Sequence, residues 1–319
     1  MTKIWLTLVV IFFSFAAHAE ALRIVTSLDS LEAKEYIAAF EQQKGVKVDW
    51  IRLSAGEALA RLAAESTNPT QDVWFGAPAI EFEAAKSKGF LASYQSPAIK
   101  MIPAAWRDPD GAWTGIYFGA IVFISGKGVI PPQSWQELLD SRYHNEIVVS
   151  YPYTAGTGFT VLNGLLASMG VDAGLDYSAQ LDHNIRRYTK SGGAPIIDVG
   201  LGEAGVGIVF EQDAIRKGTS RGFPITVTVP RDGVPYEIGA VAIIKGRDSP
   251  EAKTFMDWIV SLPAQNLMHA WYRTPLHPRA TLPADVKATW KANLAPLDVA
   301  WSGAHRQELI QQWREQIGK

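Results

Sequence analysis

The sequence contains no cysteine among its 319 residues. This absence excludes disulfide bonds, thiolate metal sites, a cysteine nucleophile and a lipid anchor on an N-terminal cysteine. An excess of charge is also missing, because 30 Lys and Arg face 32 Asp and Glu, for a formal net charge of −2. Such a balance shows nothing typical of binding to nucleic acid or to an anionic membrane surface.

Long hydrophobic runs are absent beyond the first residues, and residues 1–19 have the pattern of a secretory signal peptide. Lys3 supplies a positive charge, residues 4–15 are apolar, and Ala17-His18-Ala19 is a small-x-small cleavage site. The apolar run of about a dozen residues is shorter than the ~20 of a membrane-spanning helix, which disfavours an uncleaved anchor. We expect cleavage after Ala19. An exported chain without a lipid anchor is best retained in the periplasm of a Gram-negative bacterium.

The rest of the sequence alternates short apolar runs with amphipathic ones. Strands are predicted at residues 22–26, 46–53, 72–75, 146–150, 194–199, 206–210 and 225–229. Helices are predicted at residues 30–44, 56–66, 80–88, 134–139, 159–169, 211–217, 250–261, 263–271 and 306–317. Repeated βα units of this length imply an α/β fold with a mainly parallel sheet and helices on both faces.

Two longer apolar runs, residues 113–127 and 236–245, interrupt the alternation. We expect the chain to cross between two lobes at these runs. The predicted organisation is a signal peptide (1–19), a first lobe (20–118 and 241–319) and a second lobe (119–240). Two α/β lobes joined by two crossings form a clamshell whose ligand lies in the cleft, at the carboxyl ends of the strands.

The segment Thr154-Ala155-Gly156-Thr157-Gly158 joins a predicted strand to a predicted helix. Free N–H groups at a helix start carry partial positive charge, glycines let a ligand approach, and threonines add donors. This pattern favours phosphate, phosphonate, sulfate or carboxylate. It is not a Walker loop, because no Lys-Ser or Lys-Thr follows, and it lacks a full GxGxxG fingerprint. An ordinary helix cap through Thr154 or Thr157 is the alternative.

Five segments together resemble the solute-binding proteins of bacterial ABC importers. The resemblance lies in residues 23–27, 72–77, 154–158, 191–195 and 206–210. The branch concerned includes binders of ferric ion, polyamines, hexose phosphates and 2-aminoethylphosphonate. The resemblance implies a type II periplasmic binding fold, usually monomeric, that closes on a solute and delivers it to a permease in the inner membrane. No cofactor and no catalysis are implied.

We expect an anionic organic solute, such as an organophosphate, sugar phosphate or phosphonate. We assign the anion of this solute to the helix start, with serines at strand ends across the cleft as further donors. Acidic residues are expected to face the rest of the solute, where they would accept hydrogen bonds from an amine or from sugar hydroxyls. A second donor loop and an aromatic wall complete the site. The expected residues are Thr154, Gly156, Thr157, Gly158, Ser27, Ser54, Glu211, Asp213, Ser191, Gly192 and Trp74. The alternatives are helix capping for Ser27 and Ser54, a simple connecting turn for residues 191–193, a solvated helix start for Glu211 and a core position for Trp74.

Ferric ion is the alternative cargo within the same family. The resemblance implies a pair of adjacent tyrosines after the strand at 206–210 in ferric binders, whereas this chain reads Phe210-Glu211-Gln212-Asp213 there. The histidines are scattered without metal-ligand spacing, so no metal site is predicted. An exported phosphoester hydrolase is the alternative from another class, although no GxSxG, Ser-x-x-Lys or two-metal cluster is present. A structural envelope protein would have no small-molecule pocket.

Overall fold

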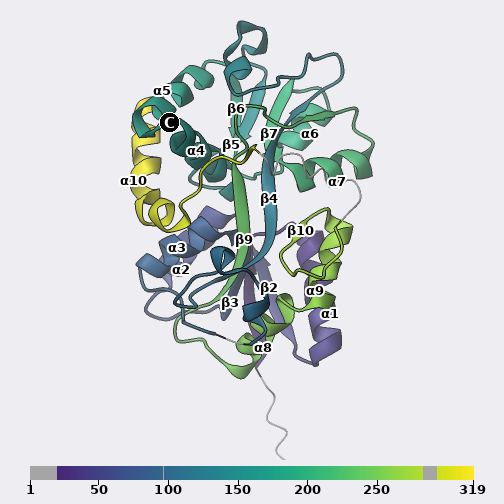
Figure 1. Ribbon diagram of the computed structural model, residues 1–319, viewed down its shortest axis with the longest axis vertical. Coiled ribbons are helices and arrows are strands. Elements are labelled where there is room, and N and C mark those ends of the chain that lie inside the picture. Colours follow the sequence, from purple (N-terminus) through teal and green to yellow (C-terminus); the bar gives the residue numbers. More distant parts are fainter. Residues whose placement is uncertain (1–19, 96, 283–292) are drawn as a thin grey trace, which may run out of the picture.

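The computed structural model describes residues 20–95, 97–282 and 293–319, and the predicted signal peptide lies outside them. Figure 1 shows two α/β lobes stacked along the long axis of the molecule. The first lobe contains the parallel strands β1 (Leu22–Thr26), β2 (Val48–Arg52) and β3 (Val73–Pro78), in the order β2-β1-β3. Each strand leads directly into a helix: α1 (Ser30–Lys44), α2 (Ala55–Ala64) and α3 (Ala79–Ser87). The predicted βα alternation of this lobe is confirmed.

The second lobe repeats this plan. Strand β5 (Ile147–Ser150) lies parallel to both β6 (Ile185–Thr189) and β7 (Val206–Phe210). The helices of this lobe are α4 (Gly156–Met169), α5 (Val171–Asp182), α6 (Pro195–Gly200) and α7 (Glu211–Arg221). Because β5 leads to α4 and β7 leads to α7, the starts of both helices lie at the carboxyl edge of the sheet, facing the first lobe.

Two long strands connect the lobes, as the fold prediction required. Strand β4 (Thr114–Ser125) is buried throughout and pairs first with β9 (Tyr236–Ile243), then with β7 and with β8 (Thr226–Thr228). Strand β9 in turn pairs with β3 of the first lobe. The central strands in Figure 1 therefore run continuously from one lobe into the other.

The C-terminal elements begin with α8 (Pro250–Ile259), α9 (Leu262–Leu267) and β10 (Thr274–Pro275), which belong to the first lobe. The last helix, α10 (Val299–Ile317), touches both lobes. Arg306 forms an ion pair of 2.6 Å with buried Glu81 of α3, and Gln316 donates to Asp176 of α5 at 3.2 Å. The predicted lobe boundaries, which assign residues 241–319 to the first lobe, remain a prediction.

Three parts of the second lobe differ from the predictions. Residues 194–199, predicted as a strand, form α6, in which Pro195 occupies the first helical turn, where its missing N–H costs nothing. Helix α5 and strand β6 were not predicted. Strand β6 reads Ile-Arg-Arg-Tyr-Thr with two exposed arginines, so it lacks the apolar run that identifies an inner strand. Residues 136–139 form a 3-10 helix within the predicted helix at 134–139.

Aromatic side chains fill the core of the first lobe. Phe40 packs edge-to-face against Phe255 and Trp258, and Phe75 packs against Phe255 in the same way. These contacts pack α1 and α8 against the sheet at β3 and so stabilise the part of the first lobe that carries the strand ends. Within the described parts of the chain, no helix combines the length and apolar character needed to cross a membrane.

Candidate functional site

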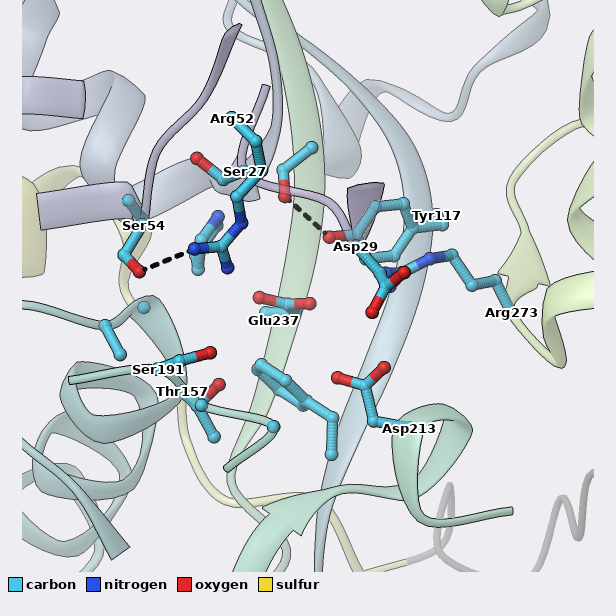
Figure 2. A pocket seen from close by; sticks show the side chains of 18 of the residues that line it. Ser27, Asp29, Arg52, Ser54, Tyr117, Thr157, Ser191, Asp213, Glu237 and Arg273 are labelled. Atoms are coloured by element: carbon cyan, nitrogen blue, oxygen red, sulfur yellow. Dashed lines mark hydrogen bonds between the residues drawn. The ribbon is translucent and has the colours of Figure 1, made fainter. Parts of the chain in front are cut away.

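A cavity of about 300 Å³ lies between the two lobes, at the carboxyl ends of their strands. Figure 2 shows side chains of both lobes pointing into it from opposite sides. Seven of the predicted site residues line this cavity: Ser27, Ser54, Gly156, Thr157, Ser191, Gly192 and Asp213. The structure thus brings together residues that lie up to 186 positions apart in the sequence, from Ser27 to Asp213.

Four predicted site residues do not line the cavity. Trp74 is fully buried in the core, where its indole Nε1 donates to Ser27 Oγ at 3.2 Å and so supports a lining residue. The Thr154 hydroxyl donates to the Tyr151 carbonyl at 3.4 Å. Gly158 packs against the Ser150–Tyr151 backbone, and Glu211 is buried at the start of α7. Strand alternation and helix geometry turn these positions away from the cleft.

The start of α4 is open toward the cavity. Its N-cap is Ala155, which has no polar side chain, and no side-chain cap hydrogen bond is present. Capping by Thr154 or Thr157, the alternative role predicted for these residues, is therefore wrong. Ala155, Gly156 and Thr157 all line the cavity, so the uncapped N–H groups and the positive end of the helix dipole lie at its wall.

Loop 191–193 closes against this helix start. A Cβ atom at Gly192 would overlap the Thr157 hydroxyl, so only glycine permits the observed approach. The loop precedes α6 and contributes Ser191, Gly192 and Gly193 to the cavity wall. The start of α4 and loop 191–193 therefore line one end of the cavity together.

Arg52 enters the same end from the first lobe. It ends β2, and its guanidinium Nη1 donates to Ser54 Oγ at 3.1 Å while Nε donates to the Leu28 carbonyl at 3.3 Å. Among the described residues it forms no ion pair with a carboxylate, unlike the other cations of the cavity. Figure 2 shows its head group held by Ser54 and directed into the cavity, above Thr157 and Ser191. An uncompensated cation therefore faces an uncapped helix start.

Ser54 itself has two roles. Its backbone N–H donates to Glu57 Oε2 at 3.0 Å, in the capping arrangement expected from the Ser-x-x-Glu pattern, and its hydroxyl accepts from Arg52. The predicted alternative for Ser54, helix capping, is confirmed together with its place in the cavity wall.

The other end of the cavity is acidic and strongly hydrogen-bonded. Glu237 of β9 is only 3% exposed, and burial raises its pKa to about 8 in spite of nearby Arg273. Arg273 is itself engaged: its Nη2 donates to Glu32 Oε2 at 2.9 Å, and its guanidinium lies 4.1 Å from the centre of the Tyr117 ring. With this pKa, Glu237 is mostly protonated at pH 7 and can both donate and accept hydrogen bonds.

Asp29 and Asp213 complete the acidic end. Burial acts to raise the pKa of Asp29, but the charges of Lys217 and Arg216 and the Leu31 N–H outweigh it and hold this pKa below its usual value. Lys217 Nζ lies 3.4 Å from Asp29. The carboxylate of Asp29 is thus ionised and forms ion pairs with Arg216 and Lys217 of the second lobe.

Several lining residues were missed from the sequence, namely Arg52, Lys217, Glu237 and Arg273 as well as Asp29. Arg52 and Glu237 carried a usable signal: one ends a strand beside Ser54, and the other is a lone acidic residue in the apolar run 236–245. Lys217 and Arg273 have no such signal, because their positions depend on how α7 and the segment before β10 pack against the cleft.

Comparison with known proteins identifies the family. The family model of bacterial extracellular solute-binding proteins matches residues 32–272. An uncharacterised protein of Haemophilus influenzae is 33% identical over 272 residues, 81% of this chain and 78% of that protein. A putative 2-aminoethylphosphonate-binding periplasmic protein of Salmonella paratyphi A is 31% identical over 180 residues, 54% of this chain and 52% of that protein.

A solved structure extends the similarity over the whole fold. The periplasmic binding protein AfuA from Actinobacillus pleuropneumoniae, with exogenous fructose-6-phosphate bound, is 30% identical, with a TM-score of 0.89 over 93% of this chain and 98% of that one. This confirms the predicted type II periplasmic binding fold. The family model, the Salmonella relative and AfuA are described as binding proteins and not as enzymes. The chain belongs to the bacterial extracellular solute-binding proteins, the substrate-binding components of ABC transporters.

Proposed function

We propose that this protein captures a small organic phosphate or phosphonate in the cleft and delivers it to an ABC permease of the inner membrane. The proposal rests on one observation: Arg52 and the uncapped start of α4 line the same cavity from opposite sides. A cation without a carboxylate partner and a set of free N–H groups bind a tetrahedral or carboxylate oxyanion better than a neutral solute.

The anion is assigned to the end of the cavity formed by Arg52, Ser54, Thr157 and loop 191–193. Arg52 supplies two or more N–H donors in a planar fork, and Ser54 and Thr157 supply hydroxyls. In Figure 2 these side chains lie on one side, whereas Asp29 and Asp213 lie on the other. A solute that spans the cavity therefore places its anion against the first group and its remainder against the second.

The acidic end favours a remainder rich in hydroxyl groups. Glu237 is mostly uncharged at pH 7, and Asp29 is paired with Lys217 and Arg216. Asp213, the third acidic residue of this end, lies 3.9 Å from Arg216 Nη2. None of the three offers an unpaired negative charge to an ammonium group, but all can exchange hydrogen bonds with hydroxyls. A sugar phosphate fits this arrangement, in keeping with the fructose-6-phosphate of the AfuA structure. The Salmonella relative makes 2-aminoethylphosphonate the second solute to test.

Ferric ion, the alternative cargo, fits the cavity less well. Three cations, Arg52, Lys217 and Arg273, line it, and each repels a trivalent metal ion. Within the described residues, no group of three or more His, Asp or Glu is placed to hold a metal ion. Hard Fe(III) needs several converging phenolate or carboxylate oxygens.

Thermal unfolding of residues 20–319 with single added solutes tests the proposal. The panel comprises fructose 6-phosphate, glucose 6-phosphate, 2-aminoethylphosphonate, inorganic phosphate, putrescine and ferric citrate. A solute at a hundred times its Kd stabilises the protein by about 2.7 kcal/mol, enough to raise the Tm by several degrees. We expect such a rise with the hexose phosphates and not with fructose or glucose. A rise with ferric citrate or putrescine alone refutes the proposal, and release of inorganic phosphate from the sugar phosphates establishes a hydrolase instead.

A further inference from the structure

Arg216 of α7 connects the second lobe to the first beside the cavity. Its Nη2 lies 3.1 Å from Asp29 Oδ2, and its guanidinium lies 4.7 Å from the centre of the Trp271 ring. Asp29 caps α1 and Trp271 precedes β10, so both partners belong to the first lobe. The side chain of Arg216 is 14% exposed, and it is not part of the cavity wall. Arg216 thus joins the two lobes without itself lining the cavity, whereas its partner Asp29 does line it and also lies 3.4 Å from Lys217 Nζ.

A second contact between the lobes lies near Ser54 and Gly156, and it is made by backbone alone. The Gly56 N–H, in the first turn of α2, donates to the Thr154 carbonyl at 3.2 Å. A Cβ atom at Gly56 would overlap the Tyr153 carbonyl oxygen, and one at Gly156 would lie 2.7 Å from the ring of Pro78. The two lobes therefore approach at this point as closely as glycine allows.

We infer that these two contacts stabilise the closed form of the protein, which makes Arg216 and Gly56 positioning residues for solute capture. Each pair joins different lobes, so hinge bending that opens the cleft separates its members. A solute enclosed by both lobes is held only by the closed form. The apparent Kd therefore equals the intrinsic Kd divided by the closed fraction. Weakening the contact at Arg216 or the one at Gly56 should weaken binding although neither residue lines the cavity.

Two substitutions test the two contacts one at a time, and each has a matched control. Arg216→Gln removes the charge and the stacking on Trp271, whereas Arg187→Gln removes an arginine whose partner Asp198 lies in the same lobe, with Nε to Oδ2 at 2.9 Å. Gly56→Ala places a methyl group against the opposite lobe. Gly126→Ala adds the same methyl group where the nearest atom is at 3.4 Å, within the second lobe.

The absence of native cysteine allows the closed fraction to be measured directly. Cysteines introduced at Lys44 of α1 and His183 beside α5, both exposed, carry a fluorescent donor and acceptor. The concentration of fructose 6-phosphate at half-closure is expected to rise roughly three- to tenfold in Arg216→Gln. In Gly56→Ala we expect a rise of about tenfold or more. High salt should reduce the difference between Arg216→Gln and the parent protein and leave that of Gly56→Ala unchanged, because only the first contact is ionic.

The outcomes distinguish this inference from the proposed function. The inference is overturned if Arg216→Gln and Gly56→Ala reach half-closure at the same concentration of fructose 6-phosphate as the parent protein and the two controls. If no phosphorylated compound closes the parent protein, the proposed function fails, and the same labels compare the closed fractions of the solute-free proteins. A lower closed fraction in Arg216→Gln and Gly56→Ala then supports the inference, and equal fractions overturn it.

Discussion

Arg52→Met removes from the cavity a guanidinium that forms no ion pair with a carboxylate among the described residues. Methionine keeps a long unbranched side chain at the end of β2, so the change is mainly one of charge and hydrogen bonding. The lost interactions inside the protein are those with Ser54 Oγ and the Leu28 carbonyl, at 3.1 and 3.3 Å. Since these are single hydrogen bonds at a half-buried position, we expect the free energy of unfolding to fall by about 1 kcal/mol.

The expected effect on binding is larger. A hydrogen bond from a charged donor contributes about 1.5–3 kcal/mol, and each 1.4 kcal/mol is a factor of ten in affinity, so the Kd for fructose 6-phosphate should rise roughly 10- to 150-fold. Arg52→Lys keeps the charge and loses the planar fork, so its Kd should lie between the two. Arg231→Met, a change at an exposed arginine on the surface, serves as the control.

Isothermal titration calorimetry at low and high salt provides the measurement. The parent protein should lose affinity as salt is added, and Arg52→Met should lose less, because one charge has left the binding site. A Kd for Arg52→Met within twofold of the parent value would refute the placement of the anion at this end of the cavity. Binding of the neutral sugar by the parent with equal affinity would refute the anion itself.

Three further predictions concern single side chains. Thr157→Val removes a hydroxyl donor at nearly constant volume and should raise the Kd for fructose 6-phosphate about tenfold by calorimetry; unchanged affinity would place the anion elsewhere. Burial raises the pKa of Glu237 from 4.5 to about 8, so the folded state keeps a proton that the unfolded chain releases, and this residue lowers stability as the pH rises through that interval. Glu237→Gln cannot ionise and should gain stability relative to the parent between pH 5 and pH 8 in urea denaturation; parallel pH profiles would contradict the assignment. Glu81→Gln leaves Arg306 without its partner in a buried ion pair and should cost about 3 kcal/mol of unfolding free energy; a loss below about 1 kcal/mol would show that α10 does not depend on this pair.

Local sequence patterns were sufficient for most elements of the fold. Strand β1 and helix α1 have the predicted bounds, because an apolar run and a helical spacing of apolar residues are local properties. Strand β6 and helix α6 were not recognised, since an edge strand with exposed arginines and a short apolar helix that starts at Pro195 depend on neighbours for their conformation.

Some features of the candidate site could likewise be predicted from the sequence, and others could not. Ser27 and Ser54 lie just past the ends of β1 and β2, and Thr157 lies in the first turn of the helix that follows β5. Because the carboxyl ends of parallel strands meet at one edge of a sheet, their place in the cavity wall could be predicted. The two possible roles of the helix start, a capped turn or an open one, could not be separated from the sequence. The structure shows an open turn, because the N-cap is Ala155 and no side chain caps the helix. Thr154 instead donates to the Tyr151 carbonyl, and Thr157 lines the cavity.

The sequence by itself determined the βα alternation, the two crossing strands and the glycine- and threonine-rich helix start, because each depends on residues close together along the chain. The tertiary structure alone decided which charges face one another across the cleft. Arg52, Glu237, Arg273 and the Arg216–Asp29 pair come from separate segments, and their protonation and pairing depend on burial and distance, which exist only after the two lobes have folded together.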